Sequence, residues 1–104
     1  MSSLNPRIMH IVLFKWTDEA TPAAIDAAVQ ALRDLKTKVP GIIELTCGEN
    51  FSDRNKGYTH GLVVHFTNRD ALEAYGPHPD HQLVVNNHIS PIRADVLAVD
   101  YELM

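Results

Sequence analysis

The sequence predicts an α+β fold in which a four-stranded antiparallel sheet carries helices on one face. Short segments rich in branched and aromatic residues are typical of strands, and a 3.6-residue apolar repeat after the first of them predicts an amphipathic helix. Turn-forming residues separate these segments in the order βαββαβ. A chain of 104 residues can bury one hydrophobic core, so we expect a single domain over residues 1–104.

The first strand is predicted over residues 8–16, a run that is too short for a solitary helix and rich in β-formers. Thr21 and Pro22 are typical of an N-cap followed by proline at the first helical position. The helix that follows should end before Pro40-Gly41. Its apolar face is predicted to consist of Ile25, Ala28, Val29, Leu32 and Leu35.

The second half of the chain repeats this alternation. Thr67 with Asp70 resembles a capping box that opens a short helix closed by Gly76, and Pro79 starts another helix. Strands are predicted over 42–47, 58–66 and 95–101, and helical segments over 67–76 and 78–89. With right-handed crossovers, this order gives the ferredoxin-like plait, a four-stranded antiparallel sheet with helices on one face.

The first and last strands are apolar on both faces, although helices on one side of a sheet can cover only one face. In the first strand, Val12 and Phe14 share one face while Ile11 and Leu13 share the other. A single chain would therefore expose a contiguous apolar surface, which usually marks an interface. We expect a homodimer that forms through the sheet face away from the helices.

Composition narrows the function classes. The formal charge of −4 and the absence of a basic stripe argue against nucleic acid as a partner. No apolar run reaches the length of a membrane span, and no signal peptide is recognisable at the start. The lone Cys47 cannot form an internal disulfide and is expected to be a buried structural thiol. These features favour a cytoplasmic protein that binds neither membranes nor nucleic acid.

Histidines are the side chains best suited to chemistry in this chain, which contains six. Strand alternation places His10 with Val12 and Phe14, and His60 with Leu62. On the later helical segment, His81 shares a stripe with apolar residues and should point inward.

Five segments in order then resemble one family along nearly the whole chain. They are His10-Ile-Val-Leu-Phe-Lys-Trp, Val39-Pro-Gly-Ile-Ile, Gly57-Tyr-Thr-His60, Tyr75-Gly-Pro-His-Pro-Asp-His81 and Val99-Asp-Tyr-Glu. The set resembles the stress-responsive dimeric A/B-barrel (Dabb) family. The resemblance implies a dimeric ferredoxin-like α/β barrel. The family it points to includes a plant polyketide cyclase that makes olivetolic acid by aldol closure of a linear tetraketide.

The resemblance also implies a site between sheet and helices. It places a catalytic pair at Tyr75 and His81. The residues expected to bind substrate are His10, His60, Val12, Phe14, Leu32, Leu62 and His78. Leu32 stands where the cyclase has a tyrosine, so we expect a different pocket shape and no olivetolic acid formation. No cofactor or metal ion is required, and no Asp or Glu is expected at a matching inward position.

Aldol chemistry suits these residue types, because imidazole can remove an acidic α-proton near neutral pH and a phenol can stabilise the resulting oxyanion. Two hypotheses remain open at this point. The first is a cofactor-free cyclase or lyase acting on a small apolar or β-keto substrate, and the second is a non-catalytic dimer that binds a hydrophobic ligand or acts in stress tolerance. For His10 and His60 a hydrogen bond within the core is an equal alternative, and His78 before Pro79 is a natural helix cap.

Overall fold

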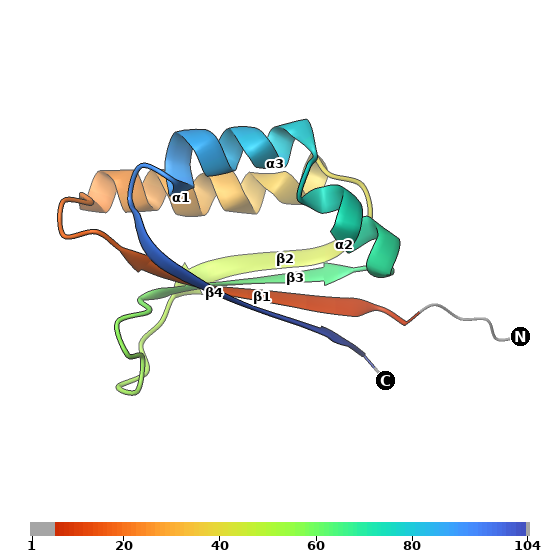
Figure 1. Ribbon diagram of the computed structural model, residues 1–104, viewed down its shortest axis with the longest axis horizontal. Coiled ribbons are helices and arrows are strands. Elements are labelled where there is room, and N and C mark those ends of the chain that lie inside the picture. Colours follow the sequence, from red (N-terminus) through yellow and green to blue (C-terminus); the bar gives the residue numbers. More distant parts are fainter. Residues whose placement is uncertain (1–5, 104) are drawn as a thin grey trace, which may run out of the picture.

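The computed structural model describes residues 6–103. Helical segments alternate with strands in the predicted order, and the second crossover contains two short helices (Figure 1). The strands are β1 (Ile8–Trp16), β2 (Ile42–Glu49), β3 (His60–Phe66) and β4 (Arg93–Glu102), and the helices are α1 (Pro22–Asp34), α2 (Arg69–Tyr75) and α3 (Pro79–Val84). A 3₁₀ turn, η1 (Leu35–Thr37), follows α1, and a π-helical turn, η2 (Val85–Ile89), extends α3.

The four strands form one antiparallel sheet in the order β2-β3-β1-β4. The helices all lie on one side of it, with α1 and α3 side by side above the strands and α2 at one end (Figure 1). This arrangement confirms the predicted ferredoxin-like fold. Because β4 pairs only with β1, it is an edge strand.

Local signals explain where the helices begin. Thr21 caps α1 as predicted, with its hydroxyl accepting from the amide of Ala24 at 3.1 Å. The predicted capping box at Thr67 is wrong, because the side chain of Asn68 caps α2 and accepts from Ala71 at 2.9 Å. Asparagine is at least as good an N-cap as threonine, so the sequence alone could not decide which of these two neighbouring residues caps the helix.

The join between η1 and β2 depends on one glycine. Gly41 has a φ of 87°, and a Cβ atom placed there would lie 2.6 Å from the Cβ of Ala71. Glycine therefore allows both the left-handed turn and the close approach of α2. The strands run slightly further than predicted at β2 and β4, and β3 begins two residues later, at His60.

The core lies between the helices and one face of the sheet. Its most completely buried large side chains are Phe66, Leu35 and Val64. Burying a side chain of this kind stabilises a fold by about 1.5–3 kcal/mol. The apolar face of α1 supplies Ala28, Val29 and Leu32 to the same cluster, as the periodicity predicted.

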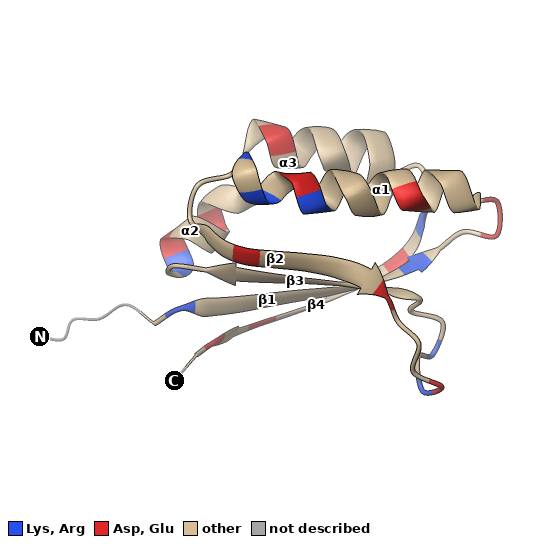
Figure 2. Ribbon diagram, turned by 180° about the vertical axis from the view of Figure 1, so that it is seen from behind, with Lys and Arg blue, Asp and Glu red and all other residues tan. Residues whose placement is uncertain are grey.

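The opposite face of the sheet is apolar but uncovered in the single chain. On β4, Leu97, Val99 and Tyr101 are 45%, 46% and 48% exposed. Charged residues lie mostly on the helices, in the loops and toward the strand ends, while the central parts of β1 and β3 carry none (Figure 2). The prediction that both sheet faces are apolar is confirmed. Within residues 6–103, no helix has both the length and the apolar character to cross a membrane.

Candidate functional site

A cavity of about 240 Å³ lies between the sheet and the helical layer. It is lined by His10, Val12, Phe14, Leu32, Leu62, Tyr75, His81, Val85, Ile89, Arg93, Val96 and Ala98. Most of these side chains are apolar, and the polar ones are few. A concave apolar site with a few polar groups is the usual form of a small-molecule site.

Tyr75 and His81 lie against each other in this cavity, with ring centroids 4.2 Å apart. Tyr75 ends α2 and His81 lies in the first turn of α3, so the short Gly76–His78 connection brings the two rings together. The Nδ1 atom of His81 is 2.9 Å from the carbonyl oxygen of Gly76. A carbonyl can only accept, so Nδ1 carries the hydrogen and the neutral ring has its lone pair on Nε2.

Burial shifts both groups toward their neutral forms. Desolvation lowers the pKa of His81 below its ordinary 6.5, and the neighbouring His10 and His78 lower it further, while the Gly76 carbonyl opposes them. Desolvation also raises the pKa of Tyr75 far above its ordinary value. At neutral pH the site therefore presents an unprotonated imidazole beside a protonated phenol.

The hydroxyl of Tyr75 is fully buried and has no hydrogen-bond partner among the described residues. An unsatisfied buried hydroxyl costs about 1–3 kcal/mol, so its retention requires an explanation. Tyr75 itself lines the cavity, so this unpaired hydroxyl belongs to the candidate site.

His10 forms a second polar pair in the site. Its Nδ1 atom hydrogen-bonds to the carboxylate of Asp100, directly opposite on β4. The expectation that no acidic residue occupies a matching inward position is therefore wrong. His10 also contacts the ring of Tyr75 edge to face, with the centroids 5.9 Å apart. Alternate residues of β4 lie on the same face of the sheet, so Asp100 lies with Val96 and Ala98 on the helix side. Following this alternation to the end of the strand would have predicted the position of Asp100.

The structure brings most of the predicted site residues together. His10, Val12, Phe14, Leu32, Leu62, Tyr75 and His81 all line the cavity. His60 does not, because it pairs with Phe14 at the far end of the β1–β3 ladder, where its Nδ1 accepts a 2.9 Å hydrogen bond from the indole of Trp16. His78 caps α3 through a 3.1 Å hydrogen bond from the amide of Asp80 and also lies outside the cavity lining.

Sequence reasoning missed five lining residues, Val85, Ile89, Arg93, Val96 and Ala98. Val85 and Ile89 lie four and eight residues after His81, on the same stripe that predicted an inward His81, so the helical repeat could have identified them. Val96 and Ala98 could have been found from β4 alternation. Arg93 begins β4 two residues before the predicted start of that strand. Within residues 6–103, no three His, Cys, Asp or Glu side chains are grouped as metal ligands.

Fold and site together define a ferredoxin-like α+β protein with an apolar His/Tyr-lined cavity beneath its helices. Residues 8–103 match the family model of the stress responsive A/B barrel domain. The chain belongs to this family.

Comparison with individual proteins agrees with this assignment. The chain is 33% identical to a stress-response A/B barrel domain-containing protein of Arabidopsis thaliana. This match covers 97% of the present chain and 40% of that relative. It is 28% identical to olivetolic acid cyclase of Cannabis sativa, over 71% of this chain and 75% of the cyclase. A dimeric ferredoxin-like protein of unknown function from Thermobifida fusca superposes with a TM-score of 0.84 at 29% identity, covering 99% of this chain and 96% of that one. The chain thus spans less than half of the Arabidopsis relative but nearly all of the solved structure.

Proposed function

We propose that this protein is a cofactor-free enzyme that forms or breaks a carbon–carbon bond next to a carbonyl group in a small apolar or β-keto substrate. His81 acts as the general base and Tyr75 as the hydrogen-bond donor to the carbonyl oxygen. The observation that carries the proposal is the contact of these two rings in an apolar cavity, with the Tyr75 hydroxyl buried and unpartnered among the described residues.

The proton movements follow from the two protonation states. The Nε2 lone pair of His81 removes a proton from the carbon next to the substrate carbonyl, and the electron pair moves onto the carbonyl oxygen as an enolate. The Tyr75 hydroxyl donates a hydrogen bond to that oxygen. The enolate carbon then attacks a second carbonyl of the same substrate, and His81 returns its proton to the new alkoxide. Bond cleavage is the same sequence in reverse.

The surroundings of the pair support this assignment. The apolar side chains Val12, Leu62 and Val85 line the same cavity and leave little water to stabilise a charged intermediate, which makes a single aimed donor more effective. His10, held by Asp100, contacts the Tyr75 ring and orients it. Positioning of this kind is a recurrent source of rate enhancement.

The test is deuterium exchange at the α-carbon of 2-octanone in D₂O, followed by proton NMR. Wild-type protein should accelerate exchange above the buffer rate, because exchange needs only the base and the oxyanion donor. His81→Gln should abolish the acceleration, and Tyr75→Phe should reduce it by about 10²-fold. His88→Asn, on the same helical segment but outside the cavity lining, is the control and should match the wild type. Exchange that His81→Gln leaves unchanged would remove the proposed base.

The largely apolar lining also favours a second candidate, a non-catalytic carrier of a hydrophobic ligand. The same experiment separates the two. A carrier would bind 2-octanone, visible as chemical-shift changes at Tyr75 and His81, without accelerating exchange. An enzyme would do both.

We also propose that the protein acts as a homodimer formed through the sheet face away from the helices. That face presents Leu97, Val99 and Tyr101, each nearly half exposed. The β2–β3 loop projects on the same side (Figure 1) and carries Phe51, which is 97% exposed. The relative from Thermobifida fusca is described as dimeric. A second copy would cover this apolar surface, as such surfaces usually require.

Leu97→Asp tests this interface by light-scattering mass measurement. We expect monomer or insoluble protein, because a carboxylate would have to be buried between two apolar sheets. Leu83→Asp is the matched control, since Leu83 is 57% exposed on α3 and lies on the helical side. A soluble Leu97→Asp protein with the dimer mass would place the interface elsewhere.

A further inference from the structure

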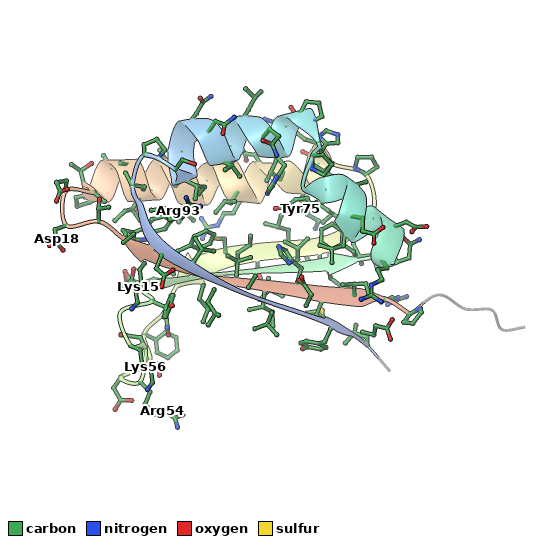
Figure 3. The ribbon with its side chains drawn as sticks, in the orientation of Figure 1. Lys15, Asp18, Arg54, Lys56, Tyr75 and Arg93 are labelled. Carbon is green, nitrogen blue, oxygen red and sulfur yellow. The ribbon has the colours of Figure 1, made fainter. Side chains whose placement is uncertain are left out.

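Arg93 is the permanently charged residue among the side chains that line the cavity. It begins β4, opposite Trp16 on β1, whereas His10 lies opposite Asp100 further along the same strand pair. Six residues therefore separate the two polar ends along β1, a backbone distance of about 20 Å. Figure 3 shows Arg93 where β4 begins, with Tyr75 nearer α2. The cavity thus runs from a cation near its rim to the His/Tyr pair.

The Arg93 guanidinium has no fixed partner within the described part of the chain. Among residues 6–103 it forms no ion pair with a carboxylate, and none of the described side-chain hydrogen bonds uses it. Asp18, one of two acidic residues in the β1–α1 loop, lies at the outer tip of that loop (Figure 3). By contrast, the guanidinium of Arg33 is held by two hydrogen bonds to the Cys47 carbonyl, at 3.1 and 2.7 Å. Arg93 is therefore free to bind a ligand.

We propose that the ligand of this cavity is an elongated amphiphile whose anionic end, a carboxylate or a phosphate, binds Arg93 while its carbonyl end lies at Tyr75 and His81. This inference rests on the proposed function and names its substrate class. Guanidinium binds both kinds of anion in a bidentate geometry. The apolar walls between the two ends, including Phe14, Leu32 and Val96, match a hydrocarbon segment.

A local cation has a particular role in this chain. The formal net charge is −4, so an anionic ligand meets an unfavourable average field at the surface. A positive side chain at the rim reverses that field locally and selects acids over neutral ligands of the same length. It also fixes which end of the ligand enters first, so that the reacting carbonyl reaches the His/Tyr pair.

Isothermal titration calorimetry with matched eight-carbon probes tests the proposal, using 1-octanol, octanoate and octyl phosphate on the 104-residue chain. Wild type should bind one or both anions about tenfold more tightly than octanol, and added salt should reduce the difference. Arg93→Gln should remove the preference, so that octanol and both anions bind with similar affinity. Arg93→Lys should keep part of it, because the charge remains and the bidentate geometry is lost.

Arg54→Gln is the matched control, because it removes the same charge from the exposed β2–β3 loop (Figure 3) and should keep the full preference. Comparing the two anions shows whether the natural ligand is a carboxylate or a phosphate ester. Equal affinity of wild type for octanol and both anions, or a preference that survives Arg93→Gln, would overturn the role of Arg93 while leaving the cavity as a ligand site. Failure of octanol itself to bind would instead count against the proposed function.

Discussion

Replacing Tyr75 with phenylalanine should make the ligand-free protein more stable while impairing its site. The ring is 2% exposed and packs against Phe66 and His10, contacts that phenylalanine preserves. Only the hydroxyl is lost, and it is buried without a partner among the described residues. Removing such a group relieves a desolvation penalty of about 1–3 kcal/mol, and we expect a net gain of about 1 kcal/mol.

For a domain of this length, a gain of about 1 kcal/mol corresponds to a rise in melting temperature of about 4–8 °C. The measurement is thermal and urea unfolding of wild type and Tyr75→Phe at one fixed protein concentration, since a dimer's stability depends on concentration. Tyr58→Phe is the control, because the exposed Tyr58 hydroxyl donates to Asp95 at 3.0 Å. That variant should show no gain.

A Tyr75→Phe protein that is less stable than wild type would refute the reasoning. It would mean that the hydroxyl already has a partner in the ligand-free state, such as a bound water molecule. A gain in stability together with loss of 2-octanone exchange would show that a polar group is retained in the core for function at the expense of stability.

Two further predictions concern the elements that hold the site. Asn68→Ala should lower the free energy of unfolding by about 1 kcal/mol, measured by urea titration, because it removes the N-cap of α2, the helix that ends at Tyr75. Asn68→Asp should retain most of the stability that this N-cap contributes. Acidification should destabilise the protein, because burial lowers the pKa of both His60 and His81 below their ordinary 6.5. The unfolded chain then binds protons more readily than the folded chain. The contribution of these two histidines to stability is therefore complete above about pH 6.5, and it is lost as the pH falls through their lower pKa values in the folded state. Unfolding curves between about pH 8 and pH 5 should show this loss for wild type and a smaller loss for His81→Gln, and an equal loss in the two proteins would contradict the protonation state assigned to His81.

Much of the fold could be predicted because its signals are local. Thr21-Pro22 begins α1, the apolar stripe through Ala28 and Leu32 sets its buried face, and strand alternation separates Val12 from Ile11. The apolar character of both sheet faces is likewise a property of the sequence, and it is sufficient to predict an exposed surface on β4. The family resemblance added the pairing of Tyr75 with His81, which no spacing rule supplies.

Tertiary structure alone decided which polar groups meet. His60 has the same strand parity as His10, yet it bonds to Trp16 while His10 meets Asp100, because the β1–β4 and β1–β3 registers fix the neighbours of each. Arg93 reaches the cavity because β4 starts earlier than its apolar pattern suggests. A sequence specifies the face on which a side chain lies through the two-residue repeat of a strand. The groups it finds on that face depend on strands distant in sequence, whose register is settled only when the whole sheet assembles.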